Sequence, residues 1–136
     1  MDRTASPLQF SHAHHRDYLS LLDRLKETWL MAFEGNVAFY QAHYLDLLAM
    51  MWWNEGPVRK TDAMGFMTGV KSPHTAAKYI ETAVEKGFLE EIDNPRDGRS
   101  RLLTLSGSMR DRMDSVMDHG LGQLIHTAQQ IMAEQV

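Results

Sequence analysis

The chain has 136 residues, 43% of them hydrophobic and 24% charged, which is typical of one folded globular domain. It contains no cysteine, which excludes disulfide scaffolds, thiolate metal sites and cysteine nucleophiles and fits a reducing cytoplasm. The formal net charge of −4 argues against a nucleic-acid binder, but residues 57–101 hold eight Lys or Arg and seven Asp or Glu, against six and eleven elsewhere. No signal peptide and no apolar run of about 18 residues is present, so we expect no membrane partner.

The first half of the chain predicts an arm followed by two helices. Residues 1–13 show no periodicity and are expected to form a flexible arm. Apolar residues at spacings of three and four predict a helix over residues 14–35 and another over 37–53. The apolar face of the first helix is wider than one small core needs, which favours contact with a second chain over packing within one subunit.

The second half predicts a short helix over residues 61–68, with Thr61 as its N-cap, and a second helix beginning at Ser72-Pro73. That helix ends at Lys86-Gly87, a basic last turn with a C-cap glycine. Two short strands, 88–92 and 101–105, enclose a segment dense in turn residues. A long helix over 107–136, capped by Ser106, keeps an apolar stripe through Ile131.

A short helix, a turn, a capped helix and a hairpin form the layout of a winged helix-turn-helix. We therefore expect a mainly α fold with a small β-hairpin wing. Residues 36–106 would form the winged helix-turn-helix, flanked by N- and C-terminal dimerisation helices over 14–35 and 107–136 within a single domain.

The face of the capped helix opposite its apolar stripe carries small polar and cationic side chains. Such a helix contacts base edges mainly with its N-terminal residues, and its free N–H groups point at phosphates. The residues on this face expected to meet DNA are His74, Thr75 and Lys78. An ordinary solvated helix face has the same composition, so this pattern alone does not decide.

The hairpin turn places three arginines, Arg96, Arg99 and Arg101, around Gly98. Basic side chains on a protruding ribbon suit a narrow minor groove, where the negative potential is enhanced. Asp97 is expected to cap the turn or to orient a neighbouring guanidinium. The alternative is a solvated turn of mixed charge.

Residues 94–106, beginning Asn-Pro-Arg-Asp-Gly-Arg, resemble the wing of the MarR (multiple antibiotic resistance regulator) family, and residues 72–75 and 84–90 resemble its recognition helix and the exit into the wing. The resemblance implies a homodimeric, DNA-binding transcription regulator whose terminal helices interlock. It also implies that Arg99 enters the minor groove and that Asp97 and Gly98 support the wing. The positions that the resemblance places at the major groove are Ser72, His74, Thr75 and Lys78. The sequence departs from the family at Gly65, inside the short helix, and in a longer loop before Ser72.

Aromatic residues gather where the first two helices meet. By resemblance, this junction takes a small aromatic effector, whereas a plain core is the alternative. The residues concerned are Trp29, Tyr40, His43, Tyr44 and Trp52.

Other chemistry finds little support in the sequence. His12, His14 and His15 lie close together in the sequence, but a zinc site needs three or four ligands of fixed geometry, and only Asp17 could complete the set. A solvated arm is therefore favoured, and no metal or cofactor is expected. No nucleophile elbow, P-loop, dinucleotide fingerprint or zincin motif is present, which argues against an enzyme with catalytic residues.

The combined prediction is a cytoplasmic, homodimeric repressor that binds a pseudo-palindromic site in double-stranded DNA and responds to a small ligand. The alternative is a winged-helix protein-interaction or replication-accessory module without a ligand response.

Overall fold

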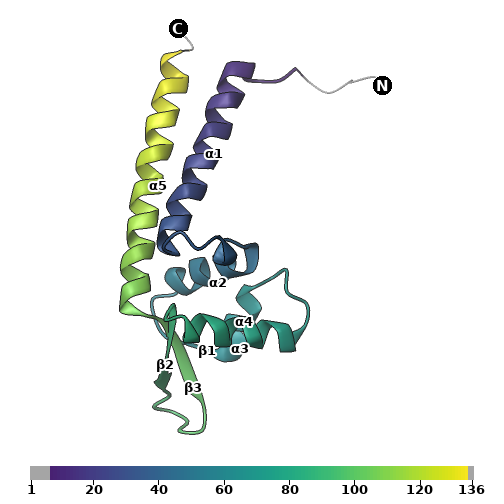
Figure 1. Cartoon of the computed structure of the whole chain (residues 1–136), viewed down its shortest axis with the longest axis vertical. Helices are drawn as coiled ribbons and strands as arrows, with labels where there is room; N and C mark the ends of the chain where they lie inside the picture. Colours follow the sequence, from purple (N-terminus) through teal and green to yellow (C-terminus); the bar gives the residue numbers. More distant parts are fainter. Residues whose placement is uncertain (1–6, 135–136) are drawn as a thin grey trace.

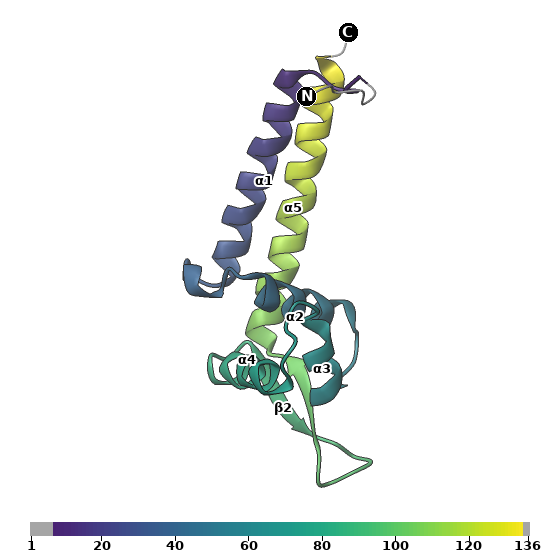
Figure 2. The same ribbon diagram turned by 90° about the vertical axis from the view of Figure 1, so that its right-hand side faces the viewer.

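The computed structural model describes residues 7–134, which form a helical stalk above a smaller head (Figure 1). The stalk consists of helices α1 (His12–Ala32) and α5 (Gly107–Ala133), which lie side by side in Figure 1 and in the turned view of Figure 2. Residues 1–6 of the expected arm lie outside the described residues. Helix α1 begins at His12, slightly before the expected start at residue 14.

Polar side chains join the two stalk helices. Arg24 on α1 donates to Gln123 Oε1 at 2.8 Å and to Thr127 Oγ1 at 2.9 Å, both on α5. Nearer the head, Arg112 on α5 forms an ion pair with Glu34, just beyond the end of α1. Because each guanidinium reaches a specific partner on the neighbouring element, the two contacts favour one register between the helices.

Several large apolar side chains are exposed on the stalk. The large hydrophobic side chains exposed there on α1 and α5 are Tyr18, Leu19, Leu22, Met31, Leu121, Leu124, Ile125 and Met132. So many exposed large apolar side chains on two neighbouring helices are unusual for a chain that stays alone in water.

The helix expected over residues 37–53 is divided in the structure. A 3₁₀ turn, η1 (Val37–Phe39), comes first, and α2 (Ala42–Trp53) follows it. Asn36 caps the 3₁₀ turn by accepting from the Ala38 N–H at 3.0 Å, and Gln41 then adopts an extended conformation. The apolar spacing continues across this break, which is why periodicity alone predicted a single helix.

The short third helix, α3 (Lys60–Phe66), begins one residue before the expected N-cap. Thr61 is therefore inside the helix, and Arg59 occupies the N-cap position without a side-chain hydrogen bond to the helix backbone. The expected cap at Thr61 was wrong because the preceding residues pair as a strand and set the start of the helix.

Helix α4 (Pro73–Glu85) has the predicted ends. Ser72 Oγ accepts from the Thr75 N–H at 3.3 Å, and proline occupies the first turn. The chain leaves α4 through Gly87, whose φ of +79° is a left-handed conformation that side chains with a Cβ rarely adopt.

The wing is part of a three-stranded antiparallel sheet of order β1-β3-β2. Strands β2 (Leu89–Asp93) and β3 (Arg101–Leu105) form the predicted hairpin, with Leu89 opposite Leu105. The two-residue strand β1 (Val58–Arg59) pairs with β3 and was not predicted, because two residues carry no measurable alternation.

The core lies at the junction of head and stalk. The rings of Phe33, Phe39 and Phe88 pack against one another with centroids 5.0–6.1 Å apart. Met109 and Met113 from the first turns of α5 are fully buried in the same cluster. Helix α5 is therefore both an element of the head core and half of the stalk, which fixes the direction in which the wing projects.

Candidate nucleic-acid interface

The exposed face of α4 begins with the residues predicted to meet DNA. Ala76, Ile80 and Ala83 are buried on its inner side, whereas Ser72, His74 and Lys78 are exposed and Thr75 is half-buried. The first two turns thus present a hydroxyl, an imidazole and an ammonium group at the positive end of the helix dipole. This is an arrangement that can contact both phosphates and base edges.

Further along α4 the same stripe turns acidic. His74, Lys78, Glu81 and Glu85 follow one another at spacings of four, three and four, which places them on one helix face. Lys60 Nζ at the start of α3 lies 3.9 Å from Glu81 Oε1. The cationic part of the face is therefore limited to the first two turns.

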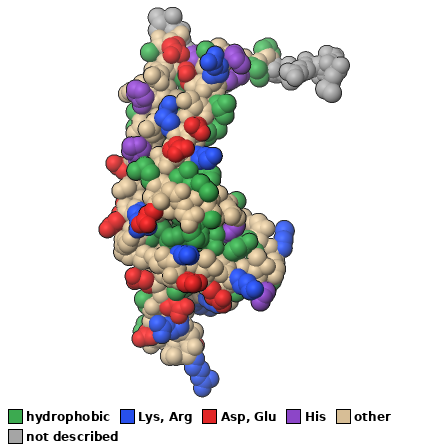
Figure 3. Space-filling view, viewed as in Figure 1, with side chains coloured by type: hydrophobic (Ala, Val, Ile, Leu, Met, Phe, Trp, Pro, Cys, Tyr) green, Lys and Arg blue, Asp and Glu red, His purple; other side chains and the backbone are tan. Residues whose placement is uncertain are grey.

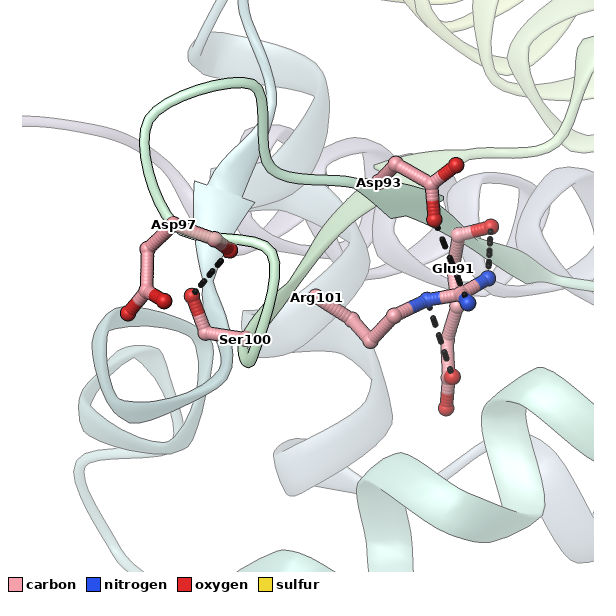
Figure 4. A network of polar contacts seen from close by, with 5 residues as sticks. All are labelled: Glu91, Asp93, Asp97, Ser100 and Arg101. Carbon is pink, nitrogen blue, oxygen red and sulfur yellow. Dashed lines mark hydrogen bonds and ion pairs between the residues drawn. The ribbon is translucent and has the colours of Figure 1, made fainter.

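The turn of the wing is held by side chains bonded to backbone groups. The Asp97 carboxylate accepts from the Arg99 N–H at 3.0 Å, and Asn94 Oδ1 accepts from the Arg96 N–H at 3.0 Å. Ser100 donates to the Asp97 carbonyl at 3.4 Å, a contact drawn in Figure 4. The Asp97 side chain thus acts on the turn backbone.

Gly98 has no special conformation in this turn. Its φ is not positive, and a Cβ built on it meets no atom within 4 Å. A larger residue would fit at this position, so the structure gives no steric reason for a glycine here.

The three wing arginines differ in their surroundings. Arg101 lies on β3 and pairs with Asp93 at 3.3 Å and with Glu91 at 3.9 Å, as Figure 4 shows. Arg96 and Arg99 lie in the exposed turn, and neither forms an ion pair with the residues that the structure describes. Lys and Arg side chains mark the far end of the wing in Figure 3.

No family model matches this sequence, and no curated protein matches it. Solved structures do resemble it in fold. RV1404 from Mycobacterium tuberculosis aligns with 17% identity and a TM-score of 0.67 over 93% of this chain and 84% of its own. The transcriptional regulator Tm0710 from Thermotoga maritima aligns with 14% identity and a TM-score of 0.56, covering 88% and 81%.

A mutant of MepR from a multidrug resistant S. aureus clinical isolate gives a TM-score of 0.57 at 12% identity, covering 95% of this chain and 86% of its own. The chain has the fold of MarR-like winged-helix regulators. In that fold the predicted recognition helix is α4, and the predicted wing is the β2–β3 hairpin.

The MarR-like fold does not bring the five predicted effector-site residues into one cavity. Tyr44 is buried in the head core, and Trp52 donates its indole N–H to Asp114 on α5 at 2.8 Å. Trp29 and Tyr40 line two different clefts, one between α1 and α5 and one along α1. Clustering in the sequence reflected a shared helix junction, in which side chains point to different faces.

His43 joins the head core to α4. Its ring stacks on Tyr79 of α4, with centroids 3.8 Å apart and planes 19° apart. Burial lowers the pKa of His43 from its ordinary value, against the opposing attraction of Asp46. Its Nε2 atom is buried and has no hydrogen-bond partner among the described residues, so the neutral imidazole is favoured at this interface.

The sequence analysis did not identify two cations that lie beside α4 and the wing. Arg59 and Lys60 adjoin the wing because β1 pairs with β3, and they form ion pairs with Asp62 and Glu81 respectively. Recognition of the two-residue strand β1 would have been needed to place them there.

The histidine-rich start of α1 makes other contacts. His14 lies 3.5 Å from Glu134 and packs edge-on against Phe10. Across residues 7–134, no cluster of His, Asp or Glu side chains fits a metal ion. The described helices also include none with the length and apolar character that crossing a membrane requires.

Proposed function

We propose that this protein binds double-stranded DNA as a homodimer and regulates transcription. The observation that carries the proposal is that both surfaces lie on the head: α4 crosses it with its capped start at one side, and the wing turn projects at the end opposite the stalk (Figure 1). Both surfaces end in cations without ion-pair partners among residues 7–134, namely Lys78 and Arg99. The MarR-like fold supports the same assignment.

The shapes of the two DNA grooves determine which part of the protein is proposed to bind in each. The first turn of α4, with Ser72, His74, Thr75 and Lys78, enters the major groove, which admits an α-helix. The wing turn places Arg96 and Arg99 at the minor groove, whose negative potential attracts guanidinium groups. Arg101, held by acids on β2, acts on the wing itself more than on the duplex.

A second copy of the chain is proposed to cover the apolar stalk. Leu121 and Leu124 on α5 and Leu19 and Leu22 on α1 are exposed in one subunit, and a symmetric partner offers the same surface. Residues 14–35 and 107–136 then form the dimerisation region, and residues 36–106 the DNA-binding region. Two-fold symmetry presents two recognition helices to one duplex, which predicts a pseudo-palindromic operator.

We propose repression by occlusion of the operator, modulated by a small aromatic ligand. Of the predicted effector residues, Tyr40 lines a cleft of about 590 Å³ together with Lys26 and Arg16, so an aromatic acid is the favoured ligand class. Titration calorimetry with phenolic carboxylates tests this part. Heat of binding together with a loss of DNA affinity supports it, and the absence of both contradicts it.

A winged-helix module for protein interaction is the second candidate. It is favoured by the acidic side chains on β2, where Glu90, Glu91 and Asp93 are all exposed. An interaction module would not require the wing turn to carry unpaired arginines.

Selection from a random duplex pool, followed by binding assays, tests the main proposal. We expect an enriched pseudo-palindrome, a loss of about 1–3 kcal/mol in binding for Arg99→Ala, and a salt slope smaller by about one for Lys78→Ala. Lys86→Ala is the matched control, because Lys86 is an exposed cation at the opposite end of α4. If no sequence is enriched and both variants bind duplex DNA like the parent, the DNA-binding proposal is wrong.

A further inference from the structure

A cleft of about 420 Å³ lies at the corner between α4 and the wing. It is the inner angle between the two surfaces proposed to grip DNA, so a duplex touching both the α4 turn and the wing turn spans this corner. The cleft is lined by residues from α3, α4 and all three strands, namely Arg59, Lys60, Thr61, Ile80, Glu81, Glu91, Ser100, Arg101 and Leu103.

The cations that line this cleft are each paired with an acid. Arg59 lies 3.3 Å from Asp62, Lys60 lies 3.9 Å from Glu81, and Arg101 is held by acids on β2 (Figure 4). The cations at the two projecting ends, such as Lys78 and Arg99, have no such partner among the described residues. The positive charges in the corner are thus neutralised by acids of the same chain, whereas those at the start of α4 and in the wing turn are not.

Among these pairs, the one between Lys60 and Glu81 is suited to exchange. It joins two different elements, α3 and α4, at a long separation, and both side chains are about half or more exposed, at 48% and 68%. An exposed ion pair of this kind contributes little to stability, so a phosphate oxygen can compete for the ammonium group. Arg101, in contrast, has two acidic partners and a further hydrogen bond to the Glu91 carbonyl.

Glu81 also lies one turn beyond Lys78 on the face of α4 that points to the duplex. A carboxylate there repels the DNA backbone unless a cation screens it. Lys60 can screen Glu81 or bind a phosphate, but its full charge cannot serve both at once.

We propose that Lys60 exchanges partners on DNA binding, from Glu81 in the free protein to a backbone phosphate in the complex, and that Glu81 thereby limits duplex affinity. This inference rests on the proposed DNA-binding function. It gives Glu81 a defined role as a positioning residue that sets how much Lys60 contributes to phosphate binding.

The test measures affinity for a random-sequence duplex of about 30 base pairs over a range of salt concentrations. Glu81→Gln is expected to bind about two- to fivefold more tightly near 0.1 M salt. Its salt slope is expected to be steeper by about one, because one more phosphate is neutralised. In a Lys60→Met background, Glu81→Gln is expected to bring no such gain. Thermal unfolding of each variant checks that the fold is kept.

Glu85→Gln is the matched control, since it removes the same charge from the same face of α4 and Glu85 has no ion-pair partner among residues 7–134. Equal gains from Glu81→Gln and Glu85→Gln, or a gain that persists without Lys60, would show a general charge effect and overturn the exchange. If the parent binds no duplex at any salt concentration, the proposed function fails, and the inference fails with it. Duplex binding by the parent with an unchanged Glu81→Gln variant refutes only the exchange.

Discussion

The head and the stalk of this protein differ in how far their large apolar side chains are buried. In the head, Leu47, Leu48 and Met51 of α2 are buried against α4, the sheet and the start of α5. On the stalk, Leu19 and Leu121 are more than half exposed, at 66% and 58%. The head thus buries its large apolar side chains within the chain, whereas the stalk leaves several of them exposed, and this is the surface that we propose a second copy covers.

The largest effect that separates the two regions is expected from charges placed on the stalk. Leu121→Glu combined with Leu124→Glu should convert a dimer into monomers, because each carboxylate buried without a partner costs about 3–5 kcal/mol and symmetry doubles the number. Sedimentation velocity measures the mass. DNA affinity should fall at least about 100-fold, because the two half-sites are no longer bound together.

The control for this variant is Gln130→Glu, which adds the same charge to an exposed position on the opposite side of α5 from Leu121. It should leave the mass unchanged. A double variant that sediments like the parent would mean that the apolar stalk is not an interface.

A core truncation in the head gives the next largest effect. Leu48→Ala is expected to lower the free energy of unfolding by about 2–5 kcal/mol, because Leu48 is fully buried and its removal leaves a cavity. Leu19→Ala on the stalk should have no such effect on the isolated subunit. Urea unfolding at several protein concentrations distinguishes the two, since only the Leu19 variant should change the concentration dependence. Equal losses for both would remove the contrast between head and stalk.

Most of the head could be predicted because the residues that start and end its helices act locally. The start of α4 is set by Ser72-Pro73, its end by Lys86-Gly87, and the start of α5 by Ser106, as the sequence indicated. Each of these signals acts on the backbone within a few residues. The break before α2 could not be predicted from apolar spacing, because the extended backbone at Gln41 interrupts the helix while the apolar pattern continues on both sides of it.

The candidate site was predicted less completely than the fold. Lys60 and Arg59 reach the wing only through pairing of β1 with β3, which is a long-range contact. The partners of Arg101 likewise depend on the hairpin register, which sets Asp93 opposite Arg101. Local sequence indicates which side chains are cationic, but tertiary pairing decides which of them remain available to a phosphate.

A smaller effect on stability is expected at the end of α4. Gly87→Ala should cost about 1–2 kcal/mol, because Gly87 adopts a left-handed conformation that alanine disfavours. Gly65→Ala, inside α3, is the matched control with the opposite sign, since its φ is not positive and a Cβ there meets no atom. It should stabilise the head by up to about 1 kcal/mol. Thermal unfolding measures the change in stability of each variant relative to the parent. If both variants were stabilised, or both destabilised, the result would contradict the structure.

The smallest expected effect is a pH dependence arising from His43, where the head core meets α4. Burial lowers the pKa of His43 in the folded protein, so the unfolded chain binds a proton there more readily than the folded chain does. The resulting stability is fully present above the unfolded pKa, about 6.5, and is lost as the pH falls through the folded pKa.

The variant His43→Phe keeps an aromatic ring on Tyr79 and removes the titratable imidazole. Urea unfolding from about pH 8 to about pH 5 should therefore show a steeper loss of stability in the parent than in the variant. Parallel curves would mean that the imidazole at this interface binds protons as it does in the unfolded chain.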